Sequence, residues 1–331
     1  MLRLLKWSFL GVLLGALGFT AWFLWFVSHP LTLRQTPLEF SIDPGLGLKQ
    51  VSRRLADSGL GLSPWQFTLL ARGLGKAGDI KAGSYEVEAG LSAWLLLEKL
   101  TRGDTSQGEL ALIDGWNLRQ LRTALDANPA LKHDSKALTE REILQRIGAP
   151  ESGLEGLLFP DTYLFPKNSS DLELLRRAYA SMQRHLLAEW TARTTELPYR
   201  SAYEALIMAS IVEKETGVAS DRGKVASVFV NRLRVGMPLQ TDPTVIYGLG
   251  DKYAGSLRRR DLVQDTAFNT YTRAGLPPTP IAMPGLASLR AALHPDKTAY
   301  LYFVARGDGS SEFSPDLESH NRAVNRFIRH K

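Results

Sequence analysis

The sequence predicts an α+β protein with a single N-terminal transmembrane helix, a small first domain and a larger domain of mixed α/β character. Three observations support this fold class. One long apolar run stands near the N-terminus, helical and strand patterns alternate along the rest of the chain, and no internal repeat is present. The 331 residues are 44% hydrophobic and 22% charged, which is the composition of a globular protein.

The first element is a run of 21 uncharged residues, WSFLGVLLGALGFTAWFLWFV, at positions 7–27. At about 1.5 Å per residue, a helix of this length crosses the roughly 30 Å hydrocarbon core of a bilayer. A cleaved signal peptide is the alternative. Its apolar region is usually shorter, however, and the SHP that follows at 28–30 lacks a small-x-small cleavage site. We therefore expect an uncleaved membrane anchor.

The charges that flank this run predict its orientation. Arg3 and Lys6 precede the run, and only Arg34 follows it closely. The positive-inside rule then makes residues 1–6 a cytoplasmic tail. Everything after residue 28 is expected to lie outside the cytoplasmic membrane.

A connector at 28–38 leads into the first domain, at 39–103. Its predicted elements are a strand at 38–42, a helix from Gly47, a helix capped by Ser63 with Pro64 at its first position, a strand at 82–87, and a helix at 93–100 capped by Ser92. This order with a small core resembles a LysM-like domain, a fold associated with peptidoglycan. A purely structural domain is the alternative.

The second domain, at 104–331, follows a polar linker at 103–108. Its predicted elements are a strand at 110–113, a helix at 117–125, helical and irregular segments at 127–150, a long helix at 172–191 with Asp171 as its cap, and helices at 201–217 and 224–235. Loops rich in Pro and Gly separate the C-terminal helices.

The helix at Ser201–Gly217, SAYEALIMASIVEKETG, is the most informative element, and Gly217 is expected to close it. At 100° per residue, Glu215 falls on the same face as Ile207 and Ile211, whereas Glu213 falls on the opposite side. A carboxyl group among apolar side chains loses hydration, so its pKa rises toward neutrality. Such a group is suited to donate a proton to a glycosidic oxygen.

An alternative for Glu215 is a helix-end residue that reaches solvent or pairs with Arg222. The helical pattern alone leaves both interpretations open.

Polar and aromatic residues in two later segments could line a sugar-binding groove. The segments are MPLQTDPTVIYG at 237–248 and FNTYTRAG at 268–275, and a proline-rich loop, LPPTPIAMPG, follows at 276–285. Tyrosine rings can stack on pyranose faces, and structural loops are the alternative. The candidate substrate-binding residues are Glu155, Glu213, Gln240, Thr241, Asp242, Thr244, Tyr247, Asn269 and Tyr271.

Other classes of chemistry are poorly supported. The absence of cysteine excludes thiol nucleophiles, thiolate metal sites and disulfides. The six histidines form no HExxH pattern, and G-x-S-x-G, P-loop and GxGxxG motifs are absent. The net charge of +6 comes without a dense Lys/Arg tract of the nucleic-acid-binding kind. We therefore expect carboxylate chemistry with no metal, no cofactor and no nucleic-acid partner.

Four long motifs resemble the MltG family of endolytic murein transglycosylases. They are MASIVEKETGVASDRGKVASVFVNRLRVGMPLQTDPTVIYGLG at 208–250, EGLLFPDTYLF at 155–165, FNTYTRAGLPPTPIAMPG at 268–285 and YLYFVARGDGSSEFSPDLESHN at 300–321. The resemblance covers nearly the whole chain, and it implies a transglycosylase domain with its catalytic core at about 155–331. The second glutamate of the family's E-K-E triplet is catalytic, and it corresponds to Glu215.

The resemblance also implies a mechanism. Glu215 protonates the leaving oxygen of the β-1,4 bond between MurNAc and GlcNAc, and its carboxylate then deprotonates the muramic C6 hydroxyl, which closes a 1,6-anhydro ring. One carboxyl group serves both steps, so the paired carboxylates of ordinary glycosidases are not required. Asp242 and Glu155 are expected to position substrate or stabilise charge.

The implied role is the cleavage of nascent glycan strands, which terminates their elongation, by an enzyme anchored in the bacterial inner membrane with its catalytic part in the periplasm. Membrane-bound glycan polymerases and transpeptidases are the expected partners. A non-catalytic peptidoglycan-binding scaffold of the synthesis machinery remains open, as does a muramidase that hydrolyses the same bond.

Overall fold

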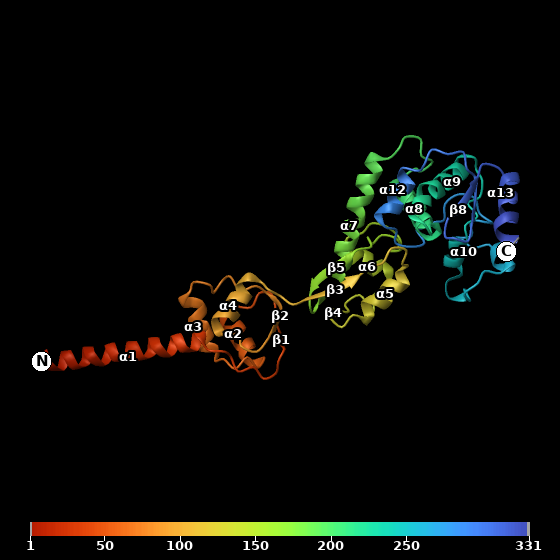
Figure 1. The fold of residues 1–331 in the computed structure, drawn as a ribbon. Helices are drawn as coiled ribbons and strands as arrows, with labels where there is room; N and C mark the ends of the chain where they lie inside the picture. The colour runs from red at the N-terminus through yellow and green to blue at the C-terminus, as the bar shows by residue number, and fades with distance from the viewer. Residues whose placement is uncertain (1, 330–331) are drawn as a thin grey trace. The chain divides into compact units, whose positions relative to one another are not determined.

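The computed structural model describes the backbone of residues 2–329 and the side chains of residues 7–329. The side chains of Arg3 and Lys6, on which the predicted orientation depends, lie outside the described residues. The chain divides into two compact units, 1–108 with 164–169 and 109–163 with 170–331 (Figure 1). Both units contain helices and strands, so the predicted mixture of helix and sheet is confirmed.

The first unit is a two-stranded ribbon packed with helices. Its elements are α1 (Leu2–Ser28), β1 (Leu38–Ile42), α2 (Leu48–Asp57), α3 (Pro64–Gly73), β2 (Gly83–Val87) and α4 (Ala93–Arg102). The strands are antiparallel, with Phe40 opposite Tyr85. Alternate ribbon residues and the apolar faces of α2, α3 and α4 form one core, in which Tyr85 is fully buried. The caps predicted at Ser63 and Ser92 are confirmed.

Helix α1 continues into this core only at its C-terminal end. Phe26 is buried there, and Phe23 and Val27 pack against the same cluster. The preceding part exposes its apolar side chains, and Trp7–Ser28 is long and apolar enough to cross a membrane. The connector that follows bends at residues 34–37 and is held in place by backbone hydrogen bonds. Leu31 N–H donates to Leu91 O at 2.8 Å, and Arg34 N–H donates to Gly59 O at 2.9 Å.

The second unit is predominantly helical. Its helices are α5 (Leu118–Ala127), α6 (Glu140–Ile147), α7 (Asp171–Ala192), α8 (Ala202–Glu215), α9 (Arg222–Arg234), α10 (Asp242–Leu249), α11 (Arg259–Val263), α12 (Leu286–Leu293) and α13 (Leu317–Val324), with short turns η1 (Ala219–Asp221), η2 (Gly250–Lys252) and η3 (Asn325–Arg329). The strands β7 (Tyr302–Ala305) and β8 (Ser311–Ser314) form an antiparallel pair.

Four further strands form two short ribbons. They are β3 (Gln107–Ala111), which pairs with β5 (Thr162–Pro166), and β4 (Leu131–Lys132), which pairs with β6 (Ser169–Ser170). Strand β3 begins within the predicted linker, three residues before the expected strand. Most of its side chains are exposed, so its polar composition was indistinguishable from that of a linker.

Helix α8 is the centre of the second unit, where it contacts α7, α9, α10 and α12 (Figure 1). All eight residues of 205–212 are buried. The predicted contrast between two faces is therefore wrong, because Leu206 and Ala209 are as fully buried as Ile211. A helix covered by neighbours on every side carries apolar residues all round.

The start of α7 and the end of α8 also differ from the predicted helix ends. Helix α7 is capped by Ser170, whose hydroxyl accepts from Leu172 N–H. Asp171 is its first helical residue and is turned instead toward Ser135. Helix α8 ends at Glu215 with Thr216 as C-cap, and Gly217 follows without the left-handed backbone that a closing glycine adopts.

Candidate active site

Glu215 lies at the last position of α8 and faces the start of α10. Its Oε1 accepts a hydrogen bond of 2.5 Å from the hydroxyl of Thr241. Burial raises the pKa of Glu215, and the charge of Asp242 raises it further, whereas the Thr241 hydroxyl and Arg232 lower it. Desolvation is the largest of these effects, so the proton is held more tightly than on an ordinary glutamate.

Two other threonines, Thr244 and Thr270, hold Thr241 in place. Thr241 N–H donates to the Thr270 hydroxyl at 3.1 Å, and the Thr244 hydroxyl donates to Thr241 O at 2.8 Å. The hydroxyls of Thr244 and Thr270 are 2.9 Å apart. All three residues are at most 2% exposed. The Thr241 hydroxyl that donates to Glu215 is therefore held by a buried network of hydrogen bonds. Thr244 contributes to the site by positioning Thr241.

Arg232 is a charged group near Glu215 that sequence analysis missed. It lies in the last turn of α9, is 7% exposed, and donates to the carbonyls of Leu301 and Leu239, both at 2.7 Å. Its charge favours the ionised form of Glu215. The sequence gives little sign of this, because arginines near helix C-termini are common and usually solvated.

The exposed Asp242 and the half-buried Tyr271 form a pair beside this cluster. The Tyr271 hydroxyl donates to Asp242 Oδ1 at 2.6 Å. Burial, followed by the hydrogen bond to Asp242, raises the pKa of Tyr271. The structure thus brings together five of the residues selected from sequence, namely Glu215, Thr241, Asp242, Thr244 and Tyr271.

Gln240 adjoins this cluster through its backbone. It has a left-handed backbone, with φ of 51°, and its N–H donates to Thr270 O at 3.1 Å. Its side chain is exposed.

Glu213 belongs to a separate group on the other side of the α8 terminus. Its Oε2 accepts from Gly285 N–H at 3.1 Å. Burial raises the pKa of Asp114, and the nearby charge of Glu213 raises it further, whereas Arg222 lowers it. Gly285 is required here, since a Cβ at this position would lie 2.6 Å from Asp114 Oδ1. Glu213 therefore secures the end of the proline-rich loop at the start of α12.

Asn269 is a buried structural residue. Its amide donates to the carbonyls of Leu262 and Gln264, at 3.0 and 2.7 Å, and its Oδ1 accepts from Tyr271 N–H. These contacts use the side chain within its own loop and orient Tyr271.

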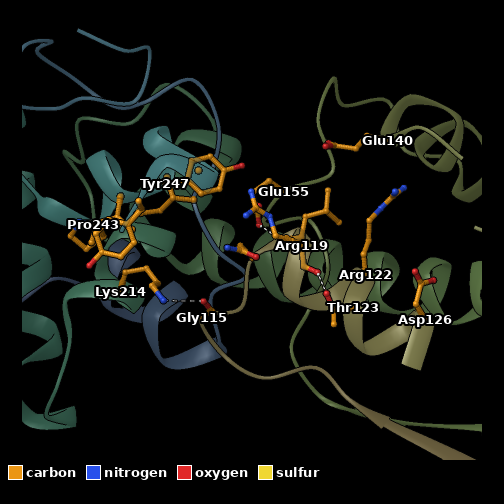
Figure 2. Close-up of a pocket in the computed structure, with 16 residues that line it drawn as sticks. Gly115, Arg119, Arg122, Thr123, Asp126, Glu140, Glu155, Lys214, Pro243 and Tyr247 are labelled. Atoms are coloured by element: carbon orange, nitrogen blue, oxygen red, sulfur yellow. Dashed lines mark hydrogen bonds between the residues drawn. The ribbon is translucent and has the colours of Figure 1, made fainter. Parts of the chain in front are cut away.

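A cavity of about 830 Å³ opens between α5 and α10. Figure 2 shows Pro243, Tyr247 and Lys214 on one side, Arg122 and Asp126 on the other, and Glu155 with Arg119 between them. Its size and mixed polar lining suit an oligosaccharide portion. Glu215 does not line this cavity, but its chain neighbour Lys214 does, as does Pro243, which follows Asp242.

Glu155 is the most strongly perturbed carboxyl group of this cavity. It is 6% exposed, and its oxygens accept from Leu118 N–H at 3.0 and 3.1 Å. Burial raises the pKa of Glu155 to about 7, although hydrogen bonds from Leu118 N–H and the Tyr247 hydroxyl oppose the rise. Glu155 and Tyr247 thus form a second cluster, distinct from that of Glu215.

The ring of Tyr247, which lines the cavity, meets that of Phe268 edge-on, with 4.8 Å between the ring centroids. Sequence analysis missed the cations on the cavity wall, Arg119, Arg122 and Lys214. The helix predicted at 117–125 indicated that Arg119 and Arg122 lie together, because arginines three residues apart share a helix face. No such signal in the sequence indicated Lys214.

Comparison with known proteins gives consistent results. The family model described as the YceG-like family matches residues 40–326. The chain is 32% identical over 317 residues to the endolytic murein transglycosylase of Bacillus subtilis, covering 90% of this chain and 86% of that protein. It is 28% identical to the endolytic murein transglycosylase of Streptococcus pneumoniae serotype 2, with 76% of this chain matched; the match spans 52% of that relative.

A crystal structure of a yceG-like protein from Listeria monocytogenes has the same fold. The two chains are 29% identical with a TM-score of 0.55, and the match covers 86% of this chain and 97% of that one.

Proposed function

The chain belongs to the YceG-like family, and from this membership we propose that it is an endolytic peptidoglycan lytic transglycosylase. The reaction cleaves the MurNAc–GlcNAc β-1,4 bond within a strand and leaves a 1,6-anhydroMurNAc end. The resemblance drawn from the motifs of the sequence is confirmed by the match. The assignment of individual residues is our proposal.

Glu215 is the general acid of the first step. Burial raises the pKa of this half-buried carboxyl group, which supports the role, since the group must carry a proton near neutral pH to protonate the leaving glycosidic oxygen. Thr241 engages Oε1, so Oε2 is the atom available to the substrate.

The same group acts as base in the second step. Once Glu215 has lost its proton, the carboxylate accepts the proton of the muramic C6 hydroxyl, whose oxygen attacks C1 and closes the anhydro ring. The Thr241 hydroxyl and the Arg232 charge stabilise this carboxylate, because both lower the pKa of Glu215. No water is consumed, and Glu215 ends the cycle protonated.

Substrate contact is assigned to the cavity and its rim. Tyr247 offers a ring for a sugar face, and Arg119 and Lys214 offer donors for hydroxyl or carboxylate groups. A glutamate with a pKa of about 7, such as Glu155, exchanges between donor and acceptor forms near neutrality. Asp242 and Tyr271 border Glu215 and are assigned to positioning the sugar at the cleaved bond.

The observation that carries this function is the half-buried carboxyl group of Glu215, whose pKa is raised by burial and which accepts a hydrogen bond from Thr241. The test is digestion of purified sacculi by the full-length chain in detergent, with mass analysis of the fragments. Anhydro ends are expected. The variant Glu215→Gln should lower their release at least about 100-fold, since general acid–base catalysis contributes that much or more. Glu204→Gln, at the opposite end of α8, is the matched control.

The two other candidate functions give different products. Reducing ends would indicate a hydrolytic muramidase, and no fragments would indicate a scaffold. If Glu215→Gln released glycan fragments at the parental rate, Glu215 would not be the general acid.

We further propose that α1 is retained as a membrane anchor, that the catalytic part lies in the periplasm, and that the first unit is LysM-like. An anchored enzyme reaches only glycan near the membrane, so nascent strands are its proposed substrate and termination of their elongation its role. Membrane-bound glycan polymerases and transpeptidases are the proposed partners. The apolar surface of Trp7–Ser28 supports the anchor, and the order of β1, α2, α3 and β2 supports the domain type.

A further inference from the structure

A second cavity, of about 430 Å³, lies in the first unit between α2 and α3. It is lined by Lys49, Arg53, Pro64, Trp65, Thr68, Leu69 and Arg72, and we call it the basic groove. Three of these residues are cations and none is acidic. Lys49, Arg53 and Arg72 are exposed, and none of their side chains forms a hydrogen bond or an ion pair with another described residue. Three unneutralised cations around one cavity favour an anionic ligand.

The basic groove also exposes apolar surface. Trp65 is 56% exposed and Leu69 is 38% exposed, four residues apart on the same face of α3. Trp94 and Leu95 at the start of α4 are similarly exposed, at 41% and 49%. An indole ring with an aliphatic neighbour and a rim of cations is the combination that binds at the lipid–water interface.

The position of Trp65 along α1 places the basic groove at such an interface. Its ring stacks on that of Trp22, with centroids 5.4 Å apart and planes 15° apart. From residue 22 to residue 28, where the apolar span ends, the helix rises about 9 Å. Trp65 is therefore level with a point about 9 Å inside the end of the apolar span, at the depth of the upper acyl chains just below the headgroups.

We propose that the basic groove binds the headgroup of an anionic phospholipid on the side of the membrane where the folded units lie. Lys49, Arg53 and Arg72 contact the phosphate, and Trp65 and Leu69 contact the upper part of the acyl chains. This inference rests on the proposed retention of α1 as an anchor. A free phosphate or a sugar would satisfy the cations but would leave Trp65 and Leu69 in water, so an amphiphile is the better match.

The test uses the full-length chain in nanodiscs of equal phosphatidylcholine and phosphatidylglycerol. Native mass spectrometry of the ejected chain counts the lipids that remain bound. We expect phosphatidylglycerol to be retained over phosphatidylcholine by at least about fivefold, the gain that one Lys or Arg gives near an anionic surface. The variant Lys49→Glu/Arg53→Glu/Arg72→Glu should lose this preference.

The matched control is Lys132→Glu/Lys136→Glu/Arg141→Glu, which makes the same charge change at exposed cations of the second unit. It should retain the preference. An unchanged preference in the groove variant, or an equal loss in both variants, would overturn the proposal. Displacement of the lipid by inorganic phosphate would also overturn it, because the ligand would then be the phosphate alone.

The experiments distinguish a wrong enzymatic function from a wrong proposal of lipid binding in the basic groove. The groove variant, solubilised in detergent, is expected to cleave purified sacculi at the parental rate, and Glu215→Gln is expected to keep the lipid preference. A chain that lacks residues 1–28 when isolated from cells would refute the anchor itself. Quenching of Trp65 by brominated phosphatidylglycerol, measured against Trp65→Phe, provides a second readout of the same contact.

Discussion

At the scale of single residues, Thr241 opposes the rise that burial causes in the pKa of Glu215. Its hydroxyl donates to the carboxyl group and so favours the ionised form. In Thr241→Val this donor is lost at nearly constant volume, and the pKa of Glu215 should rise further. We therefore expect the alkaline limb of the kcat/KM profile against pH, which reports the essential acid, to move to higher pH.

Thr241→Ser keeps the hydroxyl and should leave the alkaline limb of the kcat/KM profile at the parental pH. An unmoved limb in Thr241→Val would mean that another group governs the profile.

Glu155 should make the stability of the second unit depend on pH. Its pKa is raised from 4.5 to about 7, so the folded state binds a proton more tightly than the unfolded chain does. The resulting stabilisation is present below pH 4.5 and is lost as the pH rises through about 7. The change amounts to roughly 3 kcal/mol.

Glu155→Gln should remove this part of the pH dependence, and calorimetry at pH 5 and pH 8 would measure it. Glu173→Gln, an exposed residue of α7, is the control. If both variants keep the parental difference between the two pH values, Glu155 does not titrate in this range.

At the scale of elements, the start of α7 is joined to the loop before α6 by one buried carboxylate. Asp171 is fully buried and accepts from Ser135 N–H at 3.0 Å and from the Ser135 hydroxyl at 2.6 Å. Asp171→Ala would leave both donors without a partner. We expect it to lower the free energy of unfolding by about 3 kcal/mol, because a buried group that loses its partner bears the full desolvation cost.

Glu173→Ala removes an acidic residue from the same turn at an exposed position and should change stability by less than about 1 kcal/mol. Denaturant unfolding of both variants separates the buried bond from the general effect of charge at a helix start. Equal destabilisation would contradict the role of the buried bond.

The elements themselves were largely predictable, since their signals are local. Ser63 with Pro64, Ser92, and the alternation at 38–42 each determine a boundary through neighbouring residues, and the structure confirms these boundaries. The all-round burial of α8 was missed, because a helical wheel shows which side chains share a face but not how many other helices cover it.

At the scale of the whole molecule, Trp7–Ser28 is the segment that is long and apolar enough to cross a membrane. With its side chains exposed along most of its length, this helix has apolar surface that a bilayer would cover. We expect the full-length chain to remain in the membrane pellet after extraction with alkaline carbonate, and to keep its N-terminal peptide in mass analysis of the protein isolated from cells. Release into the supernatant would indicate cleavage or peripheral attachment.

Substituting Leu14 and Leu17 by Lys should release the chain, since each charge near the centre of a span costs about 3 kcal/mol. The same substitutions at two exposed leucines outside the span, Leu187 and Leu317, should not.

The sequence by itself determined the apolar span, the mixed fold class, the family and the identity of Glu215 as the candidate acid. The span and the fold class follow from patterns among neighbouring residues, and the family and the choice of Glu215 follow from long motifs in the sequence. Only the tertiary structure decided that Thr241, 26 residues away, is the partner of Glu215, that Arg232 opposes the rise of its pKa, and that Glu155 and Tyr247 form a second cluster. Such contacts follow from the packing of distant segments, because burial and electrostatic fields depend on the neighbours in space rather than those along the chain.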